Sequence, residues 1–199
     1  MSKNKIAIQG ELGAYSHIAA ENLYKDPEIK TCTTFEETFK QAYNDPSYKI
    51  VIPIENSLAG RVADIHYLLP KYKLQIHGEH FQAVEHNLLC KPNATISDIK
   101  FVRSHAQAIG QCQNLITKKK FKPIISADTA GSAKDLAEGK DKTIAAIASE
   151  LSAKIYNLKI LEKNIEDEKG NVTRFLIMGK NIEQPEFKKE KKFITSCIF

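Results

Sequence analysis

Short apolar runs alternate with amphipathic segments along most of this chain, and this alternation predicts an α/β protein. Residues 50–54 form a continuous apolar run, as expected for a strand covered on both faces of its sheet. The other predicted strands are at 5–8, 100–102, 122–125 and 143–146, and the predicted helices are at 16–24, 61–69, 106–117, 130–138 and 150–156, with one more beginning at residue 34.

Two signals mark helix boundaries in the first part of the chain. Thr34 and Glu37 form a capping box, because the hydroxyl and the carboxylate can each accept a hydrogen bond from the other residue's backbone N–H. Pro70 follows the helical pattern of 61–69 and lacks a backbone N–H. We therefore expect a helix to begin at Thr34 and another to end before Pro70.

Two long extended stretches interrupt the alternation, at 73–90 and 159–179. Neither has a helical pattern, so we expect each to cross between two lobes, the first near residue 78 and the second near residue 160. Two crossings make a double-stranded hinge beside an interlobe cleft, which is a preferred place for a small ligand. The predicted boundaries are 1–180 for the whole domain, 1–78 and 160–180 for lobe one, 79–159 for lobe two, and 181–199 for a charged linker.

The composition is that of an ordinary globular protein, with 42% hydrophobic and 27% charged residues among 199. The net charge of +5 favours the approach of an anionic ligand. We expect no nucleic-acid partner, because the densest lysine runs, at 118–120 and 188–192, lack the interleaved aromatic side chains that stack on bases. These runs indicate a solvated helix end and a tail.

Cysteine usage and apolar content bear on the compartment. The four cysteines, Cys32, Cys90, Cys112 and Cys197, are widely scattered, without metal-ligand spacing or a disulfide framework. No apolar run reaches the roughly 18 residues of a membrane-spanning helix. The first strand is too short for the core of a signal peptide. These features predict a cytoplasmic protein with no metal and no membrane partner.

Polar side chains gather at the ends of two predicted strands that are far apart in the sequence. The run Pro-Ile-Glu-Asn-Ser at 53–57 ends one strand, and Asn-Val-Thr-Arg-Phe at 171–175 begins another. Strand ends are where open α/β sheets present their chemistry. A carboxylate, a carboxamide, hydroxyls and a guanidinium at these ends suit a small, oxygen-rich, anionic molecule.

Arg174 is the natural anchor for a carboxylate, through a bidentate, charge-assisted pair. The alternative is a surface ion pair with Glu166 or Asp167. Strand alternation puts Thr173 and Arg174 on opposite faces, which argues against their sharing one pocket unless the strand begins irregularly.

Asn56 offers both a donor and an acceptor, which suits a leaving hydroxyl or the edge of a carboxylate. Glu55 and Ser57 flank it on a turn, where capping of the following helix is the alternative role. Glu55 either orients its neighbours or is protonated and acts as an acid, and the residue pattern leaves both open.

Together these runs resemble the prephenate dehydratase family, and the resemblance extends over residues 5–179. Two further runs carry it: Val-Arg-Ser-His-Ala-Gln at 102–107, continuing to Gln111, and the loop Gly-Glu-Leu-Gly-Ala-Tyr-Ser at 10–16. The first run has Ala106 where the family usually has proline. The loop has Ala-Tyr in place of the family's Thr-Phe, an exchange also found in plant arogenate dehydratases.

The resemblance implies a decarboxylative dehydration of prephenate to phenylpyruvate, without a cofactor because the ring becomes aromatic. It implies a fold similar to type II periplasmic binding proteins, and a homodimer. The catalytic residues that it implies are Thr173, at the leaving hydroxyl, with Asn56 and Gln111. The substrate-binding residues that we expect are Arg174, Glu55, Ser57, Ser104, Thr129, Ser16 and Phe175.

Several of these residues have an alternative, structural role. Ser104 and Gln107 form a second capping box, so Ser104 can be an N-cap alone. Gln111 lies about two turns beyond Ser104, on the same face of the predicted helix. Thr129 can also be a cap alone, and Phe175 can be core packing.

Two other functions stay open. An arogenate dehydratase performs the same chemistry on a substrate that has an amino group in place of the side-chain keto group. A non-enzymatic, two-lobed anion-binding protein is the alternative from a different class. Residues 192–199 resemble the first strand of an ACT domain, so we expect that phenylalanine-binding domain to be absent or truncated and feedback inhibition to be weak.

Overall fold

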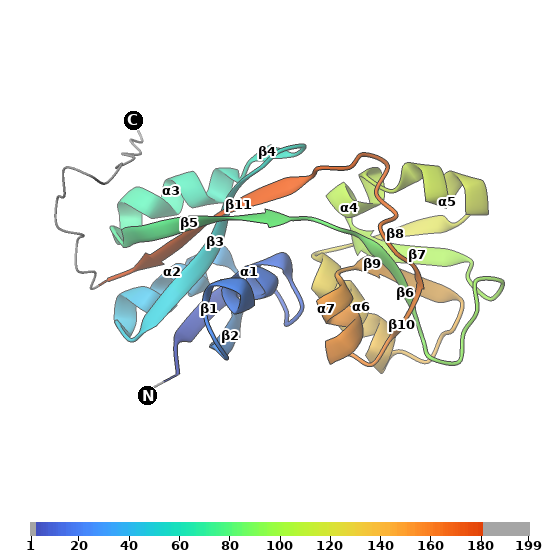
Figure 1. The fold of residues 1–199 in the computed structure, drawn as a ribbon, viewed down its shortest axis with the longest axis horizontal. Coiled ribbons are helices and arrows are strands. Elements are labelled where there is room, and N and C mark those ends of the chain that lie inside the picture. Colours follow the sequence, from blue (N-terminus) through green and yellow to red (C-terminus); the bar gives the residue numbers. More distant parts are fainter. Residues whose placement is uncertain (1–2, 181–199) are drawn as a thin grey trace.

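The computed structural model describes residues 3–180, which form two α/β lobes, each built on one mixed sheet (Figure 1). The predicted fold class is confirmed. The first sheet contains β1 (Lys5–Gln9), β2 (Glu28–Cys32), β3 (Tyr48–Asn56), β4 (Gly60–Arg61), β5 (Gln75–Ala83) and β11 (Val172–Gly179). The second contains β6 (Asn87–Cys90), β7 (Phe101–His105), β8 (Lys122–Ser126), β9 (Ile144–Ala148) and β10 (Lys159–Glu162). The helices are α1 (Tyr15–Leu23), α2 (Phe35–Asn44), α3 (Ala63–Tyr72), α4 (Ala106–Gly110), α5 (Gln113–Lys119), α6 (Thr129–Glu138) and α7 (Glu150–Ile155).

The strand order in the first sheet brings the two polar motifs together. Its order is β2-β1-β3-β11-β5, with β1, β2 and β3 parallel and β11 antiparallel to both of its neighbours. Because β3 and β11 are antiparallel, the end of β3 meets the start of β11, and Thr173 pairs with Asn56. The second sheet has the order β10-β6-β9-β7-β8, with β7, β8 and β9 parallel.

Each sheet is covered on both faces by apolar side chains. In the first lobe, Ile50 and Ile52 pack on one face with Phe39, whereas Val51 packs on the other face with Phe175. This follows from the period of two along a strand, which sends successive side chains to opposite faces. The continuous apolar run at 50–54 is therefore a central strand, as predicted, and Ile50, Val51 and Ile52 are fully buried.

Both crossings between the lobes lie later in the chain than the predicted positions of 78 and 160. β5 stays in the first sheet until Ala83, and β10 belongs to the second sheet until Glu162. The difference arises because β5 finds a complete partner in β11, so its pairing continues to the lobe boundary. The crossings also bind each other, since the N–H of Val84 donates to the carbonyl of Asn171 at 2.9 Å.

Local signals were partly right about helix boundaries. Thr34 is the N-cap of α2, and its hydroxyl accepts from the N–H of Glu37, as predicted. Pro70 does not end its helix, because it lies in the last turn of α3, which continues to Tyr72. The predicted helix at 106–117 is two helices, α4 and α5, with Gln111 as the C-cap of the first.

A loop of the first lobe docks on helix α7 of the second. The carbonyl of Gly13 accepts from the hydroxyls of Ser149, at 2.6 Å, and Ser152, at 3.1 Å. Nearby, the hydroxyl of Tyr156 donates to the carbonyl of Leu12 at 3.0 Å, and Lys134 pairs with Glu11 at 3.1 Å. These contacts and the crossing strands hold the lobes together at separate places.

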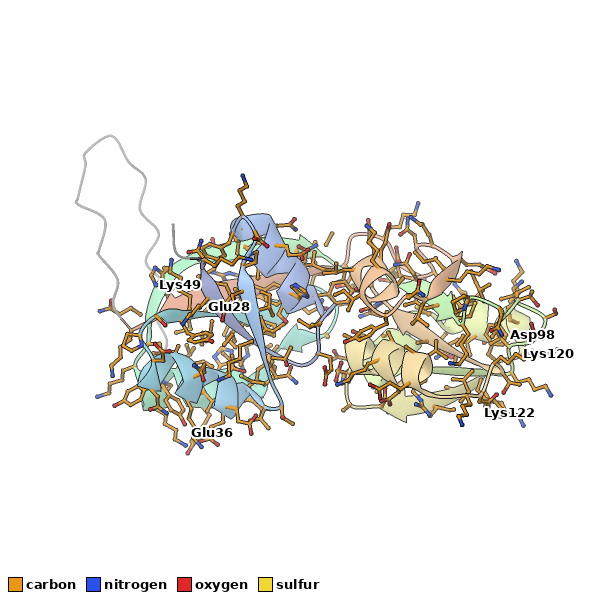
Figure 2. All side chains as sticks on the ribbon, turned by 90° about the horizontal axis from the view of Figure 1, so that it is seen from below. Glu28, Glu36, Lys49, Asp98, Lys120 and Lys122 are labelled. Carbon is orange, nitrogen blue, oxygen red and sulfur yellow. The ribbon has the colours of Figure 1, made fainter. Side chains whose placement is uncertain are left out.

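Charged side chains cover the outer ends of both lobes (Figure 2). Glu28, Glu36 and Lys49 lie on the first lobe, and Lys120 and Lys122 lie on the second. The lysine run at 118–120 is exposed at the end of α5, in agreement with a solvated helix end. Within residues 3–180, no helix has the length and apolar character needed to cross a membrane. The expected linker and ACT-like strand lie outside the described residues.

Candidate active site

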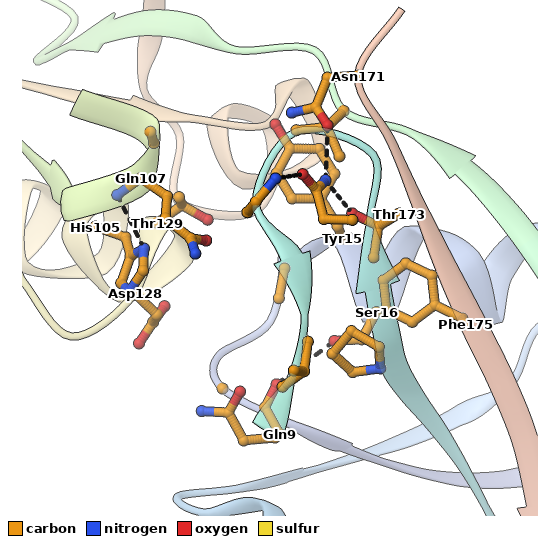
Figure 3. A pocket seen from close by; sticks show the side chains of 18 of the residues that line it. Gln9, Tyr15, Ser16, His105, Gln107, Asp128, Thr129, Asn171, Thr173 and Phe175 are labelled. Atoms are coloured by element: carbon orange, nitrogen blue, oxygen red, sulfur yellow. Dashed lines mark hydrogen bonds between the residues drawn. The ribbon is translucent and has the colours of Figure 1, made fainter. Parts of the chain in front are cut away.

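A cavity of about 540 Å³ lies between the two lobes, beside the crossing strands. Figure 3 shows Ser16, Thr173 and Phe175 on the side of the first lobe, opposite His105 and Thr129 on the second. Of the predicted site residues, those that line the cavity are Ser16, Asn56, Gln111, Thr129, Thr173 and Phe175. Those that are not part of its wall are Glu55, Ser57, Ser104 and Arg174.

Strand alternation decides which residues of the 171–175 motif meet the cavity. Thr173 and Phe175 point to the cavity side of β11, and Arg174 points to the opposite side. The guanidinium of Arg174 pairs with Glu79 on β5 at 2.6 Å and lies 5.9 Å from the ring centre of Phe81. The expectation that Arg174 anchors a carboxylate in the pocket is therefore corrected: its partners are on the sheet surface.

Three further predicted contacts have structural roles outside the cavity wall. Glu55 has a half-exposed side chain 3.8 Å from Arg174. The hydroxyl of Ser57 accepts from the N–H of Val172 at 3.0 Å, which joins the two motifs. Ser104 is completely buried in β7 and is not the N-cap of a helix.

The second predicted capping box is also wrong. Ser104 donates to the carbonyl of Ile147 at 2.7 Å, inside the second sheet. The N-cap of α4 is His105, whose Nδ1 accepts from the N–H of Gln107 at 3.3 Å. The strand extends further than its apolar run suggested, so the N-cap is one residue later than the capping box implied, although α4 begins at Ala106 as predicted.

A chain of amide side chains connects the two lobes at the cavity wall (Figure 3). Nδ2 of Asn56 donates to Oγ1 of Thr173 at 2.9 Å and to Oδ1 of Asn171 at 2.6 Å. Nδ2 of Asn171 donates to Oε1 of Gln111 at 2.8 Å. The same oxygen lies 3.0 Å from Nε2 of His86. Thr173 is thereby joined, through three amides, to a histidine on the crossing between the lobes.

His86 and Tyr15 form the buried end of this chain. The hydroxyl of Tyr15 lies 3.0 Å from Nδ1 of His86 and 2.7 Å from the carbonyl of Glu85. Burial raises the pKa of Tyr15 well above its ordinary value. The sequence motifs do not include His86, because it stands alone in an extended segment, and they assign no role to Asn171, although the 171–175 run contains it.

Burial also gives the protein an expected pH dependence. It lowers the pKa of His86 and of His17 below the ordinary 6.5. The unfolded chain then binds protons more readily than the folded protein does. The free energy of unfolding should therefore be highest above pH 6.5, where both histidines are neutral in either state, and should decrease as the pH falls below 6.5. Urea denaturation at about pH 7.5 and about pH 5.5 measures this change. The change should be smaller for His86→Gln, and equal stability at both pH values would contradict it.

The charges in the cavity wall are few. Arg61, at the end of β4, is the one arginine among the described lining residues, and the acids are Asp64 and Asp128. Arg61 takes part in no ion pair found among residues 3–180, whereas Arg103 pairs with Asp135. A cation without a protein partner is suited to an anionic ligand.

Residues 3–180 contain no group of three or more histidine, cysteine or acidic side chains placed to hold a metal ion. Burial raises the pKa of the Cys112 thiol to about 12, so this cysteine stays protonated and is a poor nucleophile. The groups available for chemistry at this cavity are therefore hydroxyls, amides, imidazoles, two carboxylates and one guanidinium.

The family model described as prephenate dehydratase matches residues 6–183. The chain belongs to the prephenate dehydratase family. The resemblance inferred from the motifs is confirmed, and the matched region includes every residue of the cavity wall.

Relatives within this family share two-fifths of the aligned residues. A bifunctional N-acyl-homoserine lactone acylase/prephenate dehydratase of Komagataeibacter europaeus is 41% identical over 175 residues, 88% of this chain and 62% of that protein. The chloroplastic arogenate dehydratase/prephenate dehydratase 2 of Arabidopsis thaliana is 40% identical over 198 residues, 100% of this chain and 51% of that protein. The chain thus spans between half and two-thirds of the length of these relatives.

The fold agrees with a solved member of the family. The crystal structure of prephenate dehydratase from Arthrobacter aurescens, in complex with L-Phe, superposes with a TM-score of 0.84 at 25% identity. The superposition covers 92% of this chain and 62% of that one. This chain therefore shares its two-lobed fold with that structure.

Proposed function

We propose that this chain is a prephenate dehydratase, a carbon–oxygen lyase that forms phenylpyruvate, water and carbon dioxide from prephenate in phenylalanine biosynthesis. One observation carries the proposal: the hydroxyl of Thr173 faces the cavity and accepts a hydrogen bond from Asn56 at 2.9 Å. Family membership supports it. The proposed enzyme is a cytoplasmic homodimer that uses no cofactor.

The reaction needs little from the protein beyond placement and one proton donor. The bond between the ring and its carboxylate breaks, and its electron pair enters the ring as the hydroxyl on the opposite carbon leaves. The carboxylate departs as carbon dioxide, and the hydroxyl takes up a proton and departs as water. Thr173 donates a hydrogen bond to that oxygen, which stabilises the charge developing on it.

The apolar part of the cavity wall suits the ring carboxylate, which leaves as carbon dioxide. Several apolar side chains line the cavity, among them Phe35, Val62, Val84 and Phe175. A carboxylate against such a wall receives little stabilisation from the protein. Because its charge disappears in the transition state, weak stabilisation of the ground state favours the reaction.

Arg61 is the proposed anchor for the pyruvyl carboxylate, in place of Arg174. Its replacement, Arg61→Gln, should raise KM about 10- to 100-fold, because a charge-assisted hydrogen bond to the substrate is lost. The effect on kcat should be smaller, since the bond is present in both ground and transition states. Steady-state kinetics with prephenate measures both constants.

Arg174→Gln is the matched control for Arg61→Gln. It removes a guanidinium that pairs with Glu79 on the sheet surface, so KM should stay within about twofold of the wild type. A large rise in KM for the Arg174 variant, with an unchanged KM for the Arg61 variant, would reverse this assignment.

The proposed activity is tested by phenylpyruvate formation from prephenate at neutral to mildly alkaline pH, where spontaneous acid-catalysed breakdown is slow. The purified chain should show saturable turnover, and light scattering on the same sample should give the mass of a dimer. Folded protein without turnover of prephenate or arogenate would leave the two-lobed anion-binding function as the better account.

Arogenate dehydratase is the second candidate, and the acids of the cavity favour it. Arogenate carries an ammonium group where prephenate carries a keto group. Asp64 and Asp128 line the cavity, and Asp128 also caps α6 by accepting from the N–H of Gly131 at 2.6 Å. Parallel kinetics with both substrates decides between them through the ratio of their kcat/KM values.

A further inference from the structure

The amide chain between Thr173 and His86 has a direction that the backbone determines. Oδ1 of Asn56 accepts from the N–H groups of Leu58, at 3.0 Å, and Ala59, at 2.9 Å. A backbone N–H can only donate, so the oxygen of this amide must be the atom facing the turn. Its nitrogen therefore faces the cavity side and gives both of its hydrogens, one to Thr173 and one to Asn171.

The same reasoning continues along the chain to His86. Oδ1 of Asn171 is turned to Asn56, so its nitrogen must be the donor to Oε1 of Gln111 at 2.8 Å. That oxygen can only accept, and Nε2 of His86 lies 3.0 Å from it. Nε2 of His86 must therefore carry a hydrogen. The backbone turn after Asn56 thus sets the donor and acceptor of each hydrogen bond along the chain, and through them the tautomer of His86.

This direction leaves two donors without protein partners at the cavity. Oγ1 of Thr173 already accepts from Asn56, and its own proton has no acceptor among residues 3–180. Oε1 of Gln111 is occupied twice, while Nε2 of Gln111 has no hydrogen-bond partner in the same residues. Both residues line the cavity. The chain therefore presents one hydroxyl proton and one amide NH₂ to a ligand rich in oxygen.

We propose that His86 is a positioning residue, whose Nε2–H holds the amide of Gln111 with its nitrogen toward the substrate, at the end of a chain in which Asn56 leaves the Thr173 proton free for the leaving hydroxyl. This inference rests on the proposed function and adds to it the device that orients its donors. Without the donor at Nε2, one of the two bonds that fix Oε1 of Gln111 is missing. The amide then rotates more freely, and its donor faces the substrate for a smaller fraction of the time.

The surroundings of His86 hold the ring firmly in place. Its side chain is almost fully buried, and its backbone N–H donates to the carboxylate of Glu166 at 3.0 Å. Its carbonyl accepts from the N–H of Ile165 at 2.9 Å, on the other crossing. The groups that face the ring are the Gln111 amide and the Tyr15 hydroxyl, whose single proton is within reach of both Nδ1 of His86, at 3.0 Å, and the Glu85 carbonyl, at 2.7 Å. The inferred tautomer requires this proton to be donated to Nδ1. A ring held by both crossings is well placed to orient groups in both lobes.

Two variants of similar size and polarity test the role. The terminal nitrogen of glutamine reaches about the place of Nε2, whereas that of asparagine reaches only the place of Nδ1. His86→Gln should therefore keep kcat within about fivefold of the wild type, and His86→Asn should lower kcat about 10- to 100-fold with a smaller change in KM. Thermal unfolding of each variant checks that both are folded.

A merely structural histidine would give a different pattern. Equal losses of kcat in the two variants, or an asparagine variant as active as the wild type, would overturn the proposal. A second readout does not depend on activity: long-range ¹H–¹⁵N spectra of the histidine rings, with the His86 signals identified by their absence in His86→Gln. We expect a proton on Nε2 of His86, and a neutral ring protonated on Nδ1 alone overturns the proposal even if the enzyme is active.

The two readouts separate this inference from the proposed function. If the wild type turns over neither substrate, the proposed function fails and the kinetic role of His86 fails with it. The spectra still decide whether the amide chain runs in the inferred direction. If the wild type is active and only the His86 pattern is wrong, the proposed function stands and the positioning role is rejected.

Discussion

Replacing Thr173 by alanine is expected to lower kcat for prephenate by about 10²- to 10⁴-fold, the range of a positioned proton donor. The hydroxyl is the one group of β11 that both faces the cavity and is held by Asn56. Its bond to the leaving oxygen strengthens as charge develops there, so KM should change much less than kcat. Initial rates of phenylpyruvate formation measure both constants.

Thr173→Ser is the matched control, because it keeps the hydroxyl and removes only a methyl group. It should retain kcat within about tenfold of the wild type. Nδ2 of Asn56 keeps its bond to Asn171 in both variants, so the fold at the motif should survive, which thermal unfolding can check. An alanine variant that retains more than about a tenth of the wild-type kcat would remove Thr173 from the centre of the mechanism.

The substitution Gly13→Ala is expected to cost about 2–4 kcal/mol of folding stability and to lower kcat/KM. Gly13 has φ of 91°, where an L side chain is strained. Its Cβ would lie 2.8 Å from Cα of Ser152 and would overlap with the hydroxyl of that residue. The loop must then move away from α7, which breaks the bonds from Ser149 and Ser152 to the Gly13 carbonyl.

Gly170→Ala separates backbone strain from this clash. Gly170 has φ of 85°, yet no atom lies within 4 Å of the place its Cβ would take. Gly170→Ala should lower the free energy of unfolding by about 1 kcal/mol, which is the contribution of backbone strain alone. Urea denaturation of the two variants measures the difference. If both lose the same stability, the contact between the Gly13 loop and α7 contributes nothing to holding the lobes together.

Much of the architecture could be predicted because it depends on local patterns. The apolar run at 50–54 marked a central strand, and the alternation of strands and helices predicted two α/β lobes. The period of two along a strand already argued that Thr173 and Arg174 face opposite sides, and the structure agrees. Local signals were wrong where pairing extended a strand, as in β5 and in β7, which includes the predicted N-cap Ser104.

The candidate site could be predicted only in part. The motifs brought out six residues that line the cavity, because their types and spacing carry the family's pattern. They gave no sign that Arg61 would line the cavity and that Arg174 would not, since both are single arginines beside polar runs. Which guanidinium reaches the cavity depends on the side of the strand and on the acid that meets it, and Glu79 is distant from Arg174 in the sequence.

The sequence by itself therefore determined the strands, the central position of the 50–54 run, the family and the side of β11 that carries Thr173. Only the tertiary structure decided the lobe boundaries, the cation of the cavity and the chain from Asn56 through Asn171 and Gln111 to His86. The reason is physical: periodicity is a property of neighbouring residues. The direction of a hydrogen bond is decided by which donor meets which acceptor, and the partners here come together only when both lobes are folded.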